Sequence, residues 1–281
     1  MQCSRGYATT PNPYIKERGC EPHVPVEVVV AVAGLISSFL SGLLGIGGGI
    51  VLTPLLLYAP QLLGAQPLSV KIVTGLTVVQ AISGSVLGAQ RHFAYGNVST
   101  RLVLTMGPPA AVASLIGALL SHDVSDQVLL GIFAAFSLLG AVFLVLPVTA
   151  QDATARDVRV NTQLAVTLAV IIGAFGGMVG IGAIAFIVAV LVYVLRVPPR
   201  VAIGSSLGIG LFGAVAAFIG KAATAQIDPV LALAVVASAV VGSPIGAWVS
   251  VRTRTDVLIR ILAVLVFIAG VRILWSALSG E

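Results

Sequence analysis

Glycines are concentrated at one point of a long apolar run, in the stretch GLLGIGGGIVLTP at residues 42–54. Gly47, Gly48 and Gly49 are consecutive, and each glycine costs a helix about 1 kcal/mol relative to alanine. Close packing between membrane helices needs only one small residue in every four. We therefore predict that the helix breaks at this point.

A break of this kind inside a membrane leaves backbone groups without partners in the helix. Such groups are tolerated only where they are buried in protein or line a watery cavity. The N–H groups at the start of the returning helix, at the positive end of its dipole, would form a site for an anion. The carbonyl groups of the same break could instead face a cation, so the break alone leaves the sign of the ligand open.

The positions of the acidic residues favour an anion. After Glu27 and before the terminal Glu281, all the acids fall in predicted loops or at the ends of apolar segments: Asp123, Asp126, Asp152, Asp157, Asp228 and Asp256. Membrane pumps and cation carriers usually place an acid in the bilayer interior. The sequence therefore argues against a carboxylate-based cation site.

Uncharged hydrogen-bonding residues occupy the interior of the apolar segments instead. Together with the glycines, the residues expected to bind the anion are Gly47, Gly48, Gly49, Thr53, Thr74, Thr77, Gln80, Gly180, Gly182, Ser205 and Ser206. A single Ser or Thr more often bonds its own helix backbone than a ligand. The basic residues expected to attract or gate the anion are Lys71, Arg91, His92 and Lys221, although most such residues at segment ends extend to the membrane interface.

The composition requires a membrane protein. Of 281 residues, 58% are hydrophobic and 9% charged, and the mean hydropathy is +1.10, whereas soluble domains carry about a quarter charged residues. The apolar runs are continuous, which favours spanning helices over barrel strands. The predicted segments are Val26–Ala59, Val70–Phe93, Leu102–Ser121, Val128–Pro147, Leu164–Leu195, Val201–Gly220, Val230–Val251 and Val257–Leu278.

The two longest segments belong to an internal repeat. SGLLGIGGGI at 41–50 matches GGMVGIGAIA at 176–185, at an offset of 135 residues. GLTVVQ matches GSSLGI, and SLIGAL matches SPIGAW, both at an offset of 129. The pairs include Thr77 and Ser206, which strengthens these two as site residues. We expect an N-terminal tail at 1–25, a first transmembrane repeat at 26–147, a linker at 148–163 and a second repeat at 164–281.

The loop charges orient the two repeats. If each long segment dips in and returns, or crosses twice, one side keeps only Lys71, Lys221 and Arg272, and the other collects Arg91, Arg101, Arg156, Arg159, Arg196, Arg200, Arg252, Arg254 and Arg260. The positive-inside rule favours this arrangement. It predicts an all-α polytopic membrane protein with two inverted-topology repeats, each a glycine-broken segment followed by three transmembrane helices. The linker is then cytoplasmic, both termini are not, and the site lies near the midplane.

Other classes of site find no support in the residue pattern. Cys3 and Cys20 can pair only if the N-terminal tail faces an oxidising compartment. The sequence has no metal-ligand pattern, P-loop or nucleophile–base pair, so we expect no metal, cofactor or enzymatic activity. The net charge of +5 is spread over short loops, which does not suggest nucleic acid. Glycine- and alanine-rich helix faces would allow a homodimer.

The motifs GLISSFLSGLLGIGGGIVLTPLLL, VTGLTVV, HFAYGNVSTRLVL and VASLIGALL closely resemble the TauE/SafE family of membrane transporters, also called sulfite exporters or toluene sulfonate uptake permeases. The resemblance runs from Val26 to Leu278. By resemblance, the matches to the family's glycine and "GTS" motifs are Gly45, Gly47, Gly48, Gly49, Gly75, Thr77, Gly180, Gly182, Gly204, Ser205 and Ser206. In the second half, Ala183 and Ile184 replace glycines of the motif.

The resemblance implies a carrier of small sulfur-containing or organic anions, such as sulfite or sulfonates, that works without ATP hydrolysis. We expect a secondary transporter in the inner or plasma membrane that exports such anions by alternating access. Two alternatives stay open: a passive anion channel, and a membrane anchor or sensor subunit that does not transport. The motif is shared by members with different substrates, so the sequence leaves the identity of the anion open.

Overall fold

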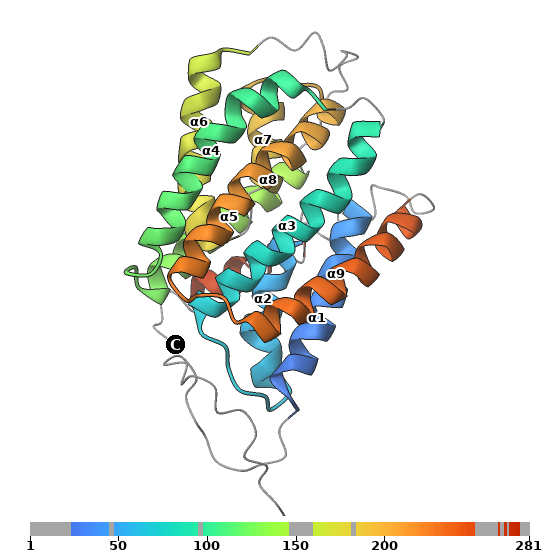
Figure 1. Ribbon diagram of the computed structural model, residues 1–281, viewed down its shortest axis with the longest axis vertical. Helices are drawn as coiled ribbons and strands as arrows, with labels where there is room; N and C mark the ends of the chain where they lie inside the picture. Colours follow the sequence, from blue (N-terminus) through green and yellow to red (C-terminus); the bar gives the residue numbers. More distant parts are fainter. Residues whose placement is uncertain are drawn as a thin grey trace, which may run out of the picture.

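The computed structural model describes residues 24–44, 48–94, 98–145, 160–180 and 184–250, with 264, 267–268 and 270–275 near the C-terminus. Within these ranges the protein is helical and has no strand, as predicted. The helices are α1 Val26–Leu44, α2 Gly49–Leu62, α3 Val70–Ala94, α4 Thr100–Leu120, α5 Asp126–Val145, α6 Thr162–Val179, α7 Ile184–Ala189, the π-helix η1 Val190–Val194, α8 Pro199–Ala223 and α9 Pro229–Ser250 (Figure 1).

Both long apolar segments are interrupted at their glycines. Helix α1 ends at Leu44, and α2 begins directly after Gly48, which has a φ of 53°. Helix α6 ends at Val179 and is followed by Gly180 at a φ of 78°. Glycine reaches this left-handed region without the steric penalty that a Cβ atom brings. The glycine runs therefore predicted the two helix ends correctly.

The remaining helices lie within a few residues of the predicted segments. Helix α6 begins at Thr162, two residues before the expected start of the second repeat. The reason is a cap, since Asn161 Oδ1 accepts the N–H groups of Gln163 at 3.1 Å and Leu164 at 3.2 Å. Cys3, Cys20 and most of the expected linker lie outside the described residues.

Five of the described helices are long and apolar enough to cross a membrane: Val26–Leu43, Thr100–Leu120, Thr162–Val179, Val201–Ala223 and Pro229–Gly246. Helices α2, α3 and α5 contain shorter apolar stretches. Large apolar side chains such as Val112, Leu233 and Val240 are exposed on the outside of the bundle. Lipid tails are as apolar as these side chains, so the surface suits a bilayer.

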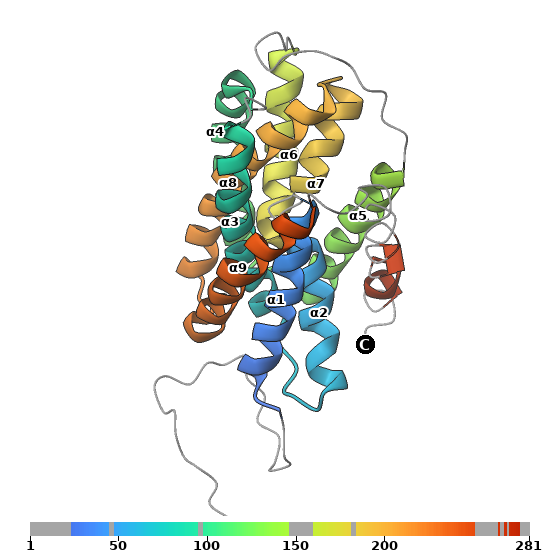
Figure 2. The same ribbon diagram turned by 90° about the vertical axis from the view of Figure 1, so that its right-hand side faces the viewer.

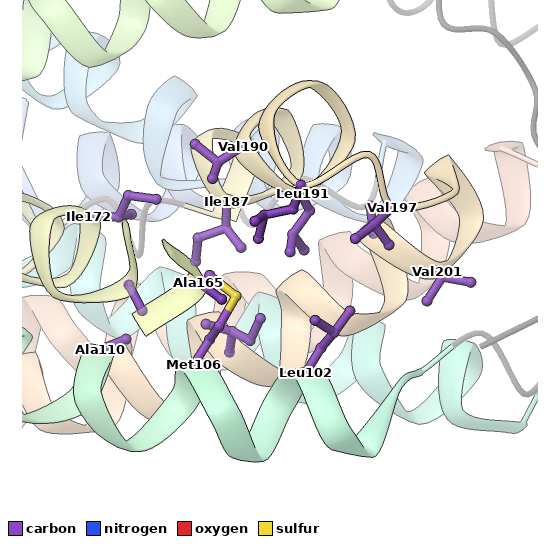
Figure 3. Packing of buried hydrophobic residues seen from close by; sticks show 14 residues of the cluster. Leu102, Met106, Ala110, Ala165, Ile172, Ile187, Val190, Leu191, Val197 and Val201 are labelled. Carbon is purple, nitrogen blue, oxygen red and sulfur yellow. The ribbon is translucent and has the colours of Figure 1, made fainter. Parts of the chain in front are cut away.

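The two largest of the apolar cores hold most of the bundle together, and a smaller one joins α2 to α5 and α6. One joins α1, α2, α3 and α9. The other joins α4, α6, α7, η1 and α8, where Met106 and Leu191 pack at the centre of the view in Figure 3. Helices α3 and α8 run through the middle of the molecule in Figure 1 and pack against each other, and in Figure 2 both lie toward the left-hand side of the bundle. The cores therefore lie on either side of this central pair.

Glycines allow a close approach between helices that are distant in sequence. Helix α1 packs along α9, and α4 packs along α6. At six glycines of these two pairs, Gly173 and Gly242 among them, a Cβ atom would come within 3.0 Å of the partner helix's backbone. The closest contacts are Gly42 with Ser243, Gly246 with Phe39, Gly177 with Ser114, and Gly117 with Ala174. Helices α1 and α4 are thus each paired with a helix that follows residue 160.

Candidate functional site

The two helix breaks lie against the same central helix, α3. A Cβ atom on Gly48 would lie 2.9 Å from Gln80 Nε2, and one on Gly180 would lie 2.9 Å from Thr77 Oγ1. Thr77 and Gln80 are three residues apart, which is about 4.5 Å along a helix. The breaks therefore adjoin α3 about one turn from each other, and both contacts are with side chains that the sequence marked as site residues.

The surroundings of Gly48 are buried and polar. Ser37 Oγ donates to the Gly48 carbonyl at 2.7 Å, and Gln80 Nε2 donates to Ser38 Oγ at 3.0 Å. The first turn of α2 has no side-chain cap at Gly48. Ser37 and Ser38 were missed by the sequence analysis, although two adjacent serines shortly before the glycine run were a usable signal. They hold the break and the amide of Gln80 in place.

The surroundings of Gly180 are formed by α3 and the end of α6. The Gly180 N–H donates to the Gly176 carbonyl at 2.8 Å, which closes α6. Thr77 Oγ1 donates to the Thr74 carbonyl at 2.8 Å, and a Cβ on Gly180 would lie 2.9 Å from the Thr74 carbonyl carbon. Thr74 and Thr77 therefore line this break, with the Thr77 proton used within α3.

The other predicted hydroxyl groups bond to the backbone, and of these only Thr53 does so next to a break. Thr53 Oγ1 donates to the carbonyl of Gly49 at 3.0 Å within α2, and Ser206 Oγ donates to that of Ile203 at 2.8 Å within α8. Ser205 Oγ accepts the Ser99 N–H at 2.9 Å, directly before α4. The structure thus brings Thr74, Thr77 and Gln80 to the breaks, whereas Ser205 anchors the start of α4.

Lys221 differs from the expectation for a basic residue at a segment end. It lies in the last turn of α8, yet its exposed fraction is 0%. Most lysines at segment ends extend to the interface, but Lys221 does not, because the turn after α4 and the α8–α9 loop supply polar partners that enclose it. Its expected role in attracting or gating the anion stays a prediction. The expectation that only uncharged polar residues occupy the interior is corrected by the same observation.

The ammonium of Lys221 donates to three neutral oxygens: Thr74 Oγ1 at 3.0 Å, Ser121 Oγ at 3.0 Å and Gln226 Oε1 at 2.9 Å. We call these four residues the Lys221 cluster. The Gln226 amide also donates to Ser121 Oγ at 3.1 Å and to Thr224 Oγ1 at 2.9 Å. Ser121 and Gln226 were missed because both lie at loops, where the sequence offers no signal of burial.

The remaining predicted residues are placed only in part. Lys71 Nζ donates to the His122 carbonyl, at the turn after α4. Arg91 and His92 belong to α3, but their side chains are outside what the structure describes, as are Gly47 and Gly182. Within the described ranges, no group of three His, Cys, Asp or Glu side chains lies together.

A small hollow lies between α4, α6, α7 and α8. Its lining is almost wholly apolar and includes Met106, Ile172 and Ile187. The polar side chain in the lining is Ser114, whose hydroxyl donates to the Gly213 carbonyl at 2.8 Å. The hollow therefore offers an anion little, and the polar contacts around α3 remain the candidate site.

Comparison with known proteins places the chain among membrane transporters. The family model described as "Sulfite exporter TauE/SafE" matches residues 30–273. The probable membrane transporter protein YunE of Bacillus subtilis is 22% identical over 268 residues, covering 89% of this chain and 98% of its own length. A probable membrane transporter protein of Xylella fastidiosa is 27% identical over 255 residues, covering 89% of this chain and 95% of its own.

A third relative, a probable membrane transporter protein of Haemophilus influenzae, is 28% identical over 182 residues, covering 64% of this chain and 67% of its own length. No solved structure matches the chain. The family model covers most of the sequence, including both helix breaks and the central helices α3 and α8. The chain is therefore a multi-pass membrane transporter that belongs to the sulfite exporter TauE/SafE family.

Proposed function

We propose that this transporter is a secondary carrier that exports small sulfur-containing anions, such as sulfite and sulfonates, by alternating access. The observation that carries the proposal is the meeting of two helix breaks on one face of α3, at Thr77 and Gln80. The family description as a sulfite exporter supports the class of anion.

Among the described residues, the first break offers hydrogen-bond donors at the start of α2. The first turn of α2 has no side-chain cap, so its N–H groups and the positive end of its dipole suit an anion. The Gln80 amide nitrogen carries two N–H groups, one of which Ser38 accepts, and the same nitrogen lies beside Gly48. Neutral donors of this kind can release the anion again, as a carrier requires.

The crossed glycine contacts support a two-fold relation between the repeats. Gly42 and Gly177 are 135 residues apart, and their contacts Ser114 and Ser243 are 129 apart, which are the offsets of the repeated motifs. Exchanging the two halves thus turns one contact into the other. The uneven distribution of basic residues favours an axis in the membrane plane, which gives inverted repeats with both termini outside the cytoplasm.

Alternating access would use the two apolar cores as separate bodies. The core of α1, α2 and α9 and the core of α4, α6 and α7 both contact the central helices. Rocking of one body against the other would open the breaks to each side in turn.

Counterflow in proteoliposomes tests the proposal. Vesicles containing purified protein are loaded with sulfite, isethionate or sulfoacetate, and uptake of the labelled anion is followed. A carrier is stimulated by anion on the opposite side, a channel is not, and a non-transporting subunit gives no saturable uptake.

The variant Gly48→Leu addresses the site. Its Cβ would lie 2.9 Å from Gln80 Nε2 and 3.1 Å from Ser41 Cβ, at a φ of 53°, so we expect counterflow to be lost. Gly131→Leu is the control, because a Cβ there has nothing within 4 Å. Counterflow at the wild-type level in correctly inserted Gly48→Leu would overturn the assignment of the break as the site.

A further inference from the structure

Lys221 is a buried cation without a buried anion. Its side chain is fully enclosed, within the candidate span Val201–Ala223. Among the residues that the structure describes, no carboxylate pairs with its ammonium; its partners are two hydroxyl groups and an amide oxygen. In the protonated form all three N–H groups are hydrogen-bonded, yet no described group neutralises the positive charge.

The other charged groups near the cluster do not supply the missing charge. Lys71 is close enough to Lys221 for the two ammonium groups to repel each other, and it donates to the His122 carbonyl. Asp123 is exposed, and Asp228 Oδ1 accepts the N–H groups of Val230 and Leu231 at the start of α9. The surroundings therefore add positive charge to the cluster.

A purely structural role for Lys221 would carry the desolvation cost of a buried charge without a compensating ion pair. Replacing a buried charged group by an apolar one of similar size is often neutral or stabilising, and charged residues inside a bilayer usually mark a ligand or ion pathway. A link between α8, α3 and the turn after α4 could be made by neutral groups alone. The charge itself is explained if an anion joins the cluster during transport.

The cluster is also directly connected to the second helix break. The hydroxyl group of Thr74 accepts a hydrogen bond from the Lys221 ammonium, and the carbonyl group of Thr74 lies against Gly180. Thr74 therefore belongs both to the Lys221 cluster and to the break at Gly180. In addition, His122 Nδ1, in the turn that contacts Lys71, is buried without a hydrogen-bond partner.

We propose that Lys221, with Thr74, Ser121 and Gln226, forms a second binding site for the oxyanion group of the transported solute, next to the break at Gly180. The anion displaces one or more of the neutral oxygens from the ammonium and neutralises its charge. This site precedes or follows the binding of the same anion at the breaks. The proposal rests on the proposed function, because it takes the cargo to be a small anion.

The decisive variant is Gln226→Glu. It replaces the amide oxygen at 2.9 Å from the ammonium by a carboxylate of nearly the same shape, which gives Lys221 an internal counter-charge. Ser121 and Thr224 keep a partner, because their hydroxyl groups can donate to the new oxygen. An incoming anion must then compete with a fixed carboxylate, whereas a purely structural link would be strengthened.

The measurement is calorimetric titration of the purified full-length protein with sulfite, isethionate and sulfoacetate, together with its melting temperature. We expect Gln226→Glu to weaken binding by about 10- to 100-fold, the range that hydrogen bonds to charged groups command, without lowering the melting temperature. Lys221→Met should weaken binding to the same degree. Ser114→Ala, which removes an α4–α8 hydrogen bond far from the cluster, should bind like the wild type.

The outcomes separate this inference from the proposed function. Wild-type affinity in Gln226→Glu would overturn the second site, whatever Gly48→Leu does. Loss of binding in Gln226→Glu with unchanged binding in Gly48→Leu would leave the Lys221 site standing and remove the site at the first break. If the wild type binds none of the three anions, both proposals fall.

A lipid headgroup carries similar oxyanion chemistry, so its contribution is measured separately. The titration is repeated in nanodiscs of phosphatidylcholine alone and in nanodiscs that contain phosphatidylglycerol. Equal affinities for the free anion in both support the solute site. Loss of binding in phosphatidylglycerol would assign the cluster to a lipid and overturn the proposal.

Discussion

Replacing Gly180 by alanine should disturb the second break through two separate effects. At a φ of 78° a residue with a Cβ atom pays about 1–2 kcal/mol for the left-handed conformation. The added Cβ would also lie 2.9 Å from both the carbonyl carbon of Thr74 and Thr77 Oγ1, where ordinary contacts begin at 3.4 Å. The end of α6 and the face of α3 must therefore separate by at least about 0.5 Å.

Overpacking of this kind typically adds about 1–3 kcal/mol, so the total destabilisation of Gly180→Ala should be about 2–5 kcal/mol. The free energy of unfolding is measured in mild detergent, and counterflow is measured per inserted molecule. Because both threonines at this break move, we expect counterflow to fall at least tenfold.

Two glycine variants separate the two effects. In Gly117→Ala the Cβ would lie 2.8 Å from the carbonyl carbon of Ala174, an overlap like that at Gly180 but without a positive φ. Its cost should be smaller than that of Gly180→Ala by the conformational part, about 1–2 kcal/mol. Gly131→Ala lies inside α5, meets nothing within 4 Å and should raise the free energy of unfolding by up to about 1 kcal/mol. Equal stability and equal counterflow in Gly180→Ala and Gly131→Ala would refute the reasoning.

Two further substitutions test individual hydrogen bonds. Gln80→Leu removes the amide that contacts Ser38 and lies beside Gly48; we expect the apparent affinity for the anion to fall about tenfold, measured by the concentration dependence of counterflow. Ser205→Ala leaves the Ser99 N–H without its acceptor and should lower the free energy of unfolding by about 1–3 kcal/mol without changing that affinity. A changed affinity with unchanged stability in Ser205→Ala would show that its hydroxyl group acts at the site instead.

The helix breaks could be predicted because they depend on local backbone preferences. Three consecutive glycines are a poor helix, and Gly48 and Gly180 adopt the left-handed conformation that favours glycine. The sequence also indicated that Gln80 contacts a polar site, because Gln80 is a polar residue in an apolar helix. Its role as a ligand stays a prediction.

The burial of Lys221 could not be predicted from the sequence. Hydropathy treats a lysine near the end of an apolar segment as interfacial, and the alternative depends on three separate parts of the chain. Thr74 lies 147 residues away, Ser121 lies 100 residues away, and Gln226 lies in the loop after α8. For Ser205 and Ser206 the matched motifs identified equivalent residues of the repeat, but the motifs did not reveal which groups their hydroxyls bond.

The pairing of α1 with α9 has a consequence for how the protein is made. A hydrogen bond from Ser238 to the carbonyl of Ala31 spans 207 residues, and Gly42 and Gly246 complete the same helix pair. Helix α1 therefore waits in the bilayer until α9, whose Ser238 follows Ala31 by 207 residues, has been synthesised before its small-residue face is covered. Assembly is consequently a late event in biogenesis, and a chain truncated before α9 leaves α1 without its principal partner.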